Sequence, residues 1–155
     1  MTVSALCSKP TLRWLILVLV AVALLVWLSG RMAAGNARDV AEIQTNPQGE
    51  RAARTMVITL ADGRIYPVNY LREGNLVFMG IDGRWWRAFV DGDAPVQTLI
   101  RGERLRGLAR VVLDDQAYVD EIFARLRPKA PSWLPAWLNG KLVVITLDTK
   151  PNETT

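Results

Sequence analysis

The sequence contains no histidine and a single cysteine, Cys7, among its 155 residues. Without histidine, the chain cannot form a Ser-His triad, use a histidine general base or bind a metal through imidazole. A single cysteine also excludes an intramolecular disulfide, a zinc ribbon and a CxxC redox pair. We therefore assign no metal ligands and no catalytic residue. If the protein is an enzyme, a question that the sequence leaves open, we expect a bound cofactor to carry the difficult chemical step.

Acidic residues are missing from the first 38 positions, which hold Lys9, Arg13, Arg31 and Arg38. The other 15 of the 19 basic residues are balanced by all 15 acidic residues, so the chain after this point has no net charge. The basic pI of about 9.6 therefore comes from the N-terminal region. This distribution suits an anionic lipid surface better than a nucleic acid, and we expect no nucleic-acid partner.

A long apolar run extends from Trp14 to Leu28 without a charged residue. As a helix rising about 1.5 Å per residue, residues 12–30 come close to the roughly 30 Å of a hydrocarbon core. Trp14 and Trp27 stand at its two ends, where aromatic rings favour the membrane interface. We predict an N-terminal tail over residues 1–11 and a transmembrane helix over residues 12–30. This helix would hold the protein in the cell (inner) membrane as a single-pass anchor.

Two questions about this segment stay open. A cleaved signal peptide is the alternative to a retained anchor, although the apolar run is long for one and Leu28-Ser29-Gly30 is a poor cleavage site. The basic residues on the two flanks are nearly balanced, with a slight bias toward a cytoplasmic amino terminus. The side of the membrane that holds the soluble domain is therefore undecided.

The remainder divides into a linker over residues 31–53, a domain over residues 54–148 and a C-terminal tail over residues 149–155. Short apolar stretches in the domain alternate with turn signals, of which Asp62-Gly63 is typical of a two-residue hairpin. Pro67 in the second stretch indicates a sheet edge or a bulge. We expect Asp114 to cap a helix with apolar residues at helical spacing from Val119 to Leu126. The predicted strands cover residues 55–60, 65–71, 76–81, 96–100, 104–113 and 141–147.

Short hairpin loops favour an antiparallel sheet, and closing that sheet into a barrel would remove its exposed edges. The predicted fold class is therefore mainly β with helices: a six-stranded antiparallel barrel plus the N-terminal transmembrane helix. Gly83–Phe89 interrupts the strand pattern and is predicted to form a short helix or loop.

Three strings of the domain are similar to one known family. They are ADGRIYPVNY (residues 61–70), DGRWWRAF (residues 82–89) and APVQTLIRGERLRGLARVV (residues 94–112). Together with the order of the elements, they resemble the FMN-binding split-barrel superfamily, nearest its branch of deazaflavin-dependent nitroreductases. The resemblance covers roughly residues 55–147. It implies a split β-barrel, FMN or a deazaflavin as cofactor, and pairing into a homodimer.

The sequence departs from that branch at the turn before the second strand. Many of those nitroreductases have a Thr-Gly-Arg-Lys-Ser-Gly-like turn that binds the phosphate of the cofactor. This chain has Leu60-Ala61-Asp62-Gly63-Arg64, without the paired glycines and the lysine. Arg64 is the only cation left in the turn.

A flavin or deazaflavin needs an aromatic or apolar wall for its rings and cations for its phosphate. The segment Gly83–Arg87 offers both within five residues. In the alternative interpretation, the tryptophans close the end of the barrel, the arginines are solvated and the tyrosines are ordinary barrel surface. The candidate cofactor-binding residues are Arg64, Tyr66, Tyr70, Arg84, Trp85, Trp86 and Arg87.

Alternation along residues 104–113 predicts that Arg104, Arg106 and Arg110 share one face of a strand. Such a row is either the solvated side of an outer strand or a face for a phosphorylated ligand or lipid headgroups.

Two hypotheses for the function follow. In the first, a membrane-anchored split barrel binds a flavin or deazaflavin and passes a hydride to a lipid-soluble acceptor such as a quinone-like or nitro compound. In the second, a non-catalytic member of the same fold serves as a membrane-tethered binding or assembly module.

Overall fold

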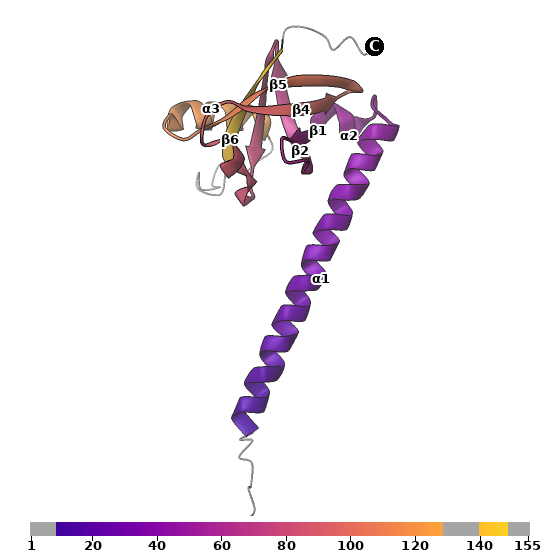
Figure 1. Ribbon diagram of the computed structural model, residues 1–155, viewed down its shortest axis with the longest axis vertical. Coiled ribbons are helices and arrows are strands. Elements are labelled where there is room, and N and C mark those ends of the chain that lie inside the picture. Colours follow the sequence, from indigo (N-terminus) through magenta and orange to yellow (C-terminus); the bar gives the residue numbers. More distant parts are fainter. Residues whose placement is uncertain (1–8, 129–139, 149–155) are drawn as a thin grey trace, which may run out of the picture. The chain divides into compact units, whose positions relative to one another are not determined.

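The structure, a computed structural model, describes residues 9–128 and 140–148, with side chains from Trp14 onward. Cys7, the start of the predicted N-terminal tail and the whole C-terminal tail lie outside the described residues. Contacts divide the chain into two units, residues 1–38 and residues 39–155, and each is described by itself. Helix α1 (Lys9–Thr45) is continuous across the boundary between them (Figure 1).

The first unit consists of the apolar part of α1. Its side chains from Trp14 to Leu28 are all exposed. By length and composition, α1 is able to cross a membrane, and an N-terminal signal sequence would meet the same criterion. The long apolar helix of the prediction is present. Whether it is a retained anchor or a cleaved signal stays a matter of prediction.

The segment predicted as a linker, residues 31–53, is largely helical. α1 continues to Thr45, and a second short helix, α2 (Glu50–Arg54), follows after a turn. The residues between 31 and 45 include many strong helix formers, and Val40 and Ile43, three positions apart, pack on the barrel. The helix ends shortly before Pro47, because the residue before a proline disfavours helical backbone angles.

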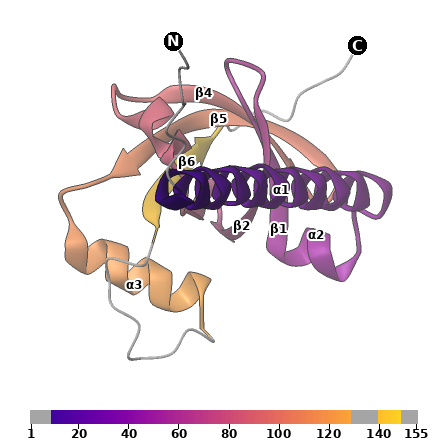
Figure 2. The same cartoon turned by 90° about the horizontal axis from the view of Figure 1, so that it is seen from below.

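Six antiparallel strands close into a barrel in the order β1-β2-β3-β6-β5-β4, as the predicted fold class requires (Figures 1 and 2). β1, β3 and β6 have the predicted bounds, whereas β2 and β4 extend two residues further. The strands are β1 (Thr55–Leu60), β2 (Ile65–Glu73), β3 (Leu76–Ile81), β4 (Ala94–Ile100), β5 (Glu103–Val112) and β6 (Lys141–Leu147). A two-turn 3-10 helix, η1 (Arg84–Phe89), connects β3 to β4.

β2 changes its partner halfway along. Ile65–Asn69 pairs with β1, and Tyr70–Glu73 pairs with β3. Leu60 N donates to Arg64 O at 2.9 Å, and hydrogen-bonded and non-hydrogen-bonded pairs alternate from there. Pro67, opposite Val57, therefore falls at a position where β1 needs no N–H donor. The split in the barrel wall at this point accommodates the proline, as the edge interpretation predicted.

The main core fills the barrel, and a second layer covers part of its outside. β3 and β6 are buried on both faces, because Val77, Met79 and Ile145 point into the barrel while Phe78 and Val144 point outward under helix α3 (Gln116–Leu126). A third, smaller cluster of Ile43, Ala52 and Val57 joins the end of α1 and α2 to β1. Figure 2 shows α3 on one side of the barrel and α2 on the other.

The cap of α3 differs from the prediction by one residue. Asp115, not Asp114, is the N-cap, and its Oδ1 accepts a hydrogen bond from Tyr118 N at 2.9 Å. Two adjacent aspartates both satisfy the sequence signal for a cap. The backbone register after β5 decides which carboxylate reaches the free N–H groups.

We predict that Gly107→Ala destabilises the barrel. A Cβ at this position would lie 2.5 Å from Thr146 O on the backbone of β6, so a strand must move. Overpacking of this kind costs about 1–3 kcal/mol, measurable as a lower midpoint in chemical denaturation. Gly35→Ala in α1 is the control, because no atom lies within 4 Å of the added Cβ. An unchanged midpoint for Gly107→Ala would contradict the close approach of β5 and β6.

We also predict that Ile43→Ala weakens the attachment of the end of α1 to the barrel. Ile43 is fully buried, and removing such a side chain costs about 2–5 kcal/mol. Hydrogen exchange of the α2 amides should therefore accelerate. Met32→Ala, at an exposed position of the same helix, should leave that exchange unchanged. If the α2 amides exchange at the same rate in the two variants, Ile43 does not attach the end of α1 to the barrel, and the prediction of a linker over residues 31–53 holds.

Candidate functional site

η1 positions two tryptophans in different environments at one end of the barrel. The side chain of Trp85 stacks on Tyr66 of β2, with ring centroids 4.5 Å apart and an interplanar angle of 11°. Its ring also meets the buried Phe89 edge-on at 5.9 Å. The Tyr66–Trp85 pair packs against the main core beside the split between β2 and β3. Trp85 is thus part of the closure of the barrel end.

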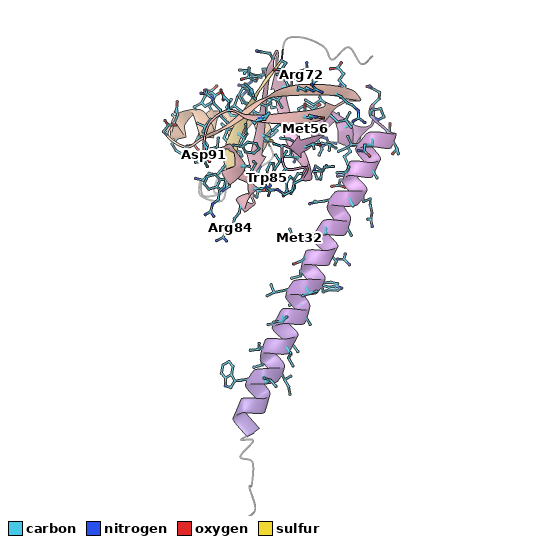
Figure 3. The ribbon with its side chains drawn as sticks, viewed as in Figure 1. Met32, Met56, Arg72, Arg84, Trp85 and Asp91 are labelled. Atoms are coloured by element: carbon cyan, nitrogen blue, oxygen red, sulfur yellow. The ribbon has the colours of Figure 1, made fainter. Side chains whose placement is uncertain are left out.

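The arginines of η1 share one side of this helix. Residues three apart eclipse one another in a 3-10 helix, which brings Arg84 and Arg87 onto the same face. Both are exposed, and neither takes part in an ion pair with any residue that the structure describes. Arg84 lies at the same end of the barrel as Trp85, and Arg72 lies at the opposite end (Figure 3).

Trp86 is half-buried and lies between two cations. The guanidinium carbon of Arg87 is 5.7 Å from the ring centroid, and Nζ of Lys141 is 6.0 Å from it. Lys141 reaches this position because Ile81, at the end of β3, pairs with Lys141 at the start of β6. The combination of an indole with an ammonium and a guanidinium gives an aromatic surface bordered by positive charge.

Arg64 is held within its own hairpin. Its guanidinium contacts the Asp62 carboxylate through Nη2 at 2.6 Å and Nε at 2.7 Å, and its Nη1 lies 3.5 Å from the Tyr66 hydroxyl. The hydrogen bond from the Arg64 side chain, and then that from its backbone N–H, lowers the pKa of Asp62. The only cation of the predicted phosphate turn is therefore already bound to a carboxylate.

Tyr70 lies apart from the other candidate residues. Four residues along an extended strand, roughly 13 Å, separate it from Tyr66, and its hydroxyl donates to Ala52 O at 3.3 Å. It lines a hollow of about 590 Å³ between α2, β1, β2 and α3. The arginines of this hollow are paired with acids: Arg51 with Asp39 and Glu42, Arg54 with Glu50, and Arg125 with Glu73 and Glu121.

The basic row of β5 lies on the outside of the barrel, with the alternation that the sequence predicted. None of its three arginines forms an ion pair with a residue that the structure describes, although acids lie near two of them. Asp148 follows β6 beside Arg106, where Asp148 N donates to Arg106 O at 2.9 Å, and Asp114 and Asp115 line a hollow together with Arg110. This environment favours the solvated interpretation of the row.

The structure thus brings six of the seven predicted residues together in two adjacent groups and separates Tyr70 from them. The first group is Tyr66, Trp85 and Arg64, and the second is Arg84, Trp86 and Arg87. The structure adds Lys141, which sequence reasoning missed because nothing in the sequence states that the first residue of the last strand faces η1. An aromatic wall and three cations are the donor set that a phosphate-bearing planar ring requires. The residues at this barrel end therefore fit such a group.

Comparison with known proteins identifies the fold and no more. No protein-family model matches the sequence, and no curated protein is significantly similar to it. A solved structure named "putative pyridoxamine 5′-phosphate oxidase" from Listeria innocua is similar with a TM-score of 0.51 and 13% identity, over 61% of this chain and 84% of that one. An FMN-binding protein from Syntrophomonas wolfei has a TM-score of 0.38 and 9% identity, over 81% and 93%.

The barrel therefore has the same fold as the Listeria innocua protein. This agrees with the split barrel that the sequence resemblance implies, whereas membership of the FMN-binding superfamily stays a prediction. The nearer resemblance, to the deazaflavin-dependent nitroreductases, stays a prediction.

We predict that the Asp62 carboxyl titrates below its ordinary range and that Arg64→Gln raises its pKa. The contact between Asp62 and Arg64 stabilises the hairpin fully at pH values above the pKa that the Asp62 carboxyl has in the unfolded chain. It is lost as the pH falls through the lower pKa of the folded state. NMR titration of the carboxyl carbon measures both pKa values. Arg72→Gln, which removes a cation from the opposite barrel end, should leave the pKa of Asp62 where it is.

Proposed function

We propose that the protein is a membrane-anchored split barrel that binds FMN or a deazaflavin at the η1 end. The observation that supports this best is the position of Trp86, half-buried between Arg87 and Lys141, with Arg84 on the same face as Arg87. The indole would border the ring system of the cofactor, and the three cations would hold the phosphate. When bound, such a cofactor supplies hydride transfer, a reaction that this histidine-free chain cannot perform with its own side chains.

Lys141 strengthens the proposal because it supplies what the predicted phosphate turn lacks. That turn has no lysine, and its Arg64 is bound to Asp62. Lys141, Arg84 and Arg87 are free of ion pairs among the described residues, so a phosphate would not have to displace a carboxylate from them. Arginine can contact two phosphate oxygens at once, and lysine adds a compact charge.

The anchor suggests the class of acceptor. A barrel tethered by α1 stays close to a bilayer, where quinone-like and nitro compounds of low polarity dissolve. The proposed reaction is therefore reduction of a lipid-soluble acceptor. The role of the chain is to bind and orient the cofactor, with Trp85 and Tyr66 closing the barrel end behind it.

A specific observation also supports the second candidate, a non-catalytic membrane-tethered module. One face of Trp85 is already covered by Tyr66, so this indole does not offer that face to a flavin. In this alternative, the aromatic residues close the barrel and the cations of η1 contact a partner instead of a phosphate.

Titration of the purified full chain in detergent with FMN and with a deazaflavin separates the two candidates. We predict saturable binding, followed by cofactor absorbance in equilibrium dialysis and by tryptophan quenching. Arg87→Gln and Lys141→Gln should each weaken binding about 10- to 100-fold, because a hydrogen bond to a charged group contributes roughly 1.5–3 kcal/mol.

Arg72→Gln is the matched control, since Arg72 lies at the opposite end of the barrel (Figure 3). This variant should bind each cofactor with the same affinity as the unmodified chain. Absence of binding at high micromolar concentrations of both cofactors would reject the redox role in favour of the non-catalytic module.

A further inference from the structure

The η1 end of the barrel presents exposed cations together with exposed apolar groups. η1 itself contributes both kinds, and Val90 directly follows it. We call this surface the η1 patch. It consists of Arg84, Trp86, Arg87, Ala88, Val90 and Lys141.

The patch carries positive charge that the described part of the chain does not neutralise. None of its three cations forms an ion pair with a described residue. Asp82, just before η1, is held by Arg127 through contacts of 3.0 and 3.2 Å. Asp91 and Asp93 follow the patch in the sequence and are exposed. Counted together with these two aspartates, the patch keeps an excess of a single positive charge, while the barrel unit as a whole has no net charge.

The apolar members of the patch lie beside its cations. Val90 is 46% exposed, and Trp86 keeps part of its ring accessible between Arg87 and Lys141. Indole rings flanked by basic side chains are typical of groups at a membrane interface, where the ring meets the acyl boundary and the cations meet the headgroups. The basic row on β5 also holds an exposed apolar residue, Leu108, between Arg106 and Arg110, but it contains no indole ring.

We propose that the η1 patch docks the barrel on the anionic phospholipid headgroups of the bilayer that α1 crosses. Arg84, Arg87 and Lys141 contact lipid phosphates, and Trp86 and Val90 enter the headgroup region. Docking orients the barrel so that its η1 end faces the membrane. The proposed function assigns the same three cations to the cofactor phosphate, so lipid and cofactor would compete for them. The docking itself does not rest on the proposed function.

The test uses the full chain, reconstituted without any flavin into vesicles of phosphatidylcholine with or without phosphatidylglycerol. In a Cys7→Ser background, an environment-sensitive fluorophore is attached to Ala88→Cys on η1 or to Asn75→Cys in the β2–β3 turn. Arg72, close to this turn, marks the barrel end opposite to η1 (Figure 3). A nitroxide on the lipid headgroup quenches a label that lies at the bilayer surface.

We expect quenching of the Ala88→Cys label in the anionic vesicles and little quenching of the Asn75→Cys label. The combined variant Arg87→Gln/Lys141→Gln should lower the ratio of docked to undocked barrel about fivefold for each cation removed. Arg54→Gln/Arg72→Gln removes the same charge outside the patch and should leave the ratio unchanged. Raising the salt concentration should weaken docking of the unmodified chain, because exposed charges are screened.

Equal quenching of the two labels in anionic vesicles would overturn the proposal, as would stronger quenching of the Asn75→Cys label. An equal loss in the patch variant and in its control would also overturn it, because net charge would then explain the effect. Circular dichroism of each variant shows that the barrel is folded. No cofactor is present in this test, so it is independent of the cofactor titration. If the barrel docks but the titration shows no cofactor binding, only the proposed function is rejected. If the cofactor binds but the barrel does not dock, only this inference is rejected.

Discussion

The molecule depends on the insertion of β6 between β3 and β5. This last strand closes the barrel, since it pairs with Leu76–Ile81 on one side and with Gly107–Val112 on the other. It also supplies both core layers, with Val143 and Ile145 inside the barrel and Leu142 and Val144 under α3. Closing so long a stretch of chain costs conformational entropy, which burial on two faces of one strand offsets. Gly107 permits the close backbone contact at this junction.

The same pairing creates the candidate site. Without β6 beside β3, Lys141 would have no reason to lie near η1, and Trp86 would have a cation on one side only. α3 depends on it as well, because the outer faces of β3 and β6 form the surface on which Ile122 and Phe123 pack. The lack of a side chain at Gly80 makes room for Phe123, whose ring would lie 2.6 Å from an added Cβ. Barrel closure, helix packing and the charges around Trp86 are therefore consequences of one strand register.

The strands could be predicted because their information is local. Turn signals such as Asp62-Gly63, with Gly63 at φ 84°, end one apolar stretch and begin the next, although this turn has three residues, 61–63, instead of the predicted two. The strand order around the barrel is not local, and so the position of Lys141 could not be predicted. The full extent of the helix through residues 31–45 could not be predicted for a related reason. Its polar composition hides a short apolar face, Val40 and Ile43, whose partner is Val57 in a different part of the chain.

Trp85 and Trp86 are adjacent in the sequence but have different neighbours in the structure. Both were candidates for the same aromatic wall, yet adjacent residues on a helix of three residues per turn point about 120° apart. Trp85 therefore stacks on Tyr66, while Trp86, which also packs against the main core, lies close to Arg87 and Lys141. The same helical geometry places Arg84 and Arg87 on one face, because they are three residues apart. The resemblance identified the segment, and the helical geometry assigns each residue its environment.

The proposed docking surface has only three cations, and tethering by the proposed anchor would make that number sufficient. A free domain that binds a bilayer loses translational and rotational freedom, at a cost estimated at about 4–15 kcal/mol. For a tethered domain, this cost falls largely on the anchor, and docking becomes an intramolecular step at high effective concentration. Contributions of roughly 1 kcal/mol per cation are then enough to select one orientation among many. A barrel unit without net charge can thus have a defined face toward the membrane, since the local distribution of charge, and not its sum, sets the orientation.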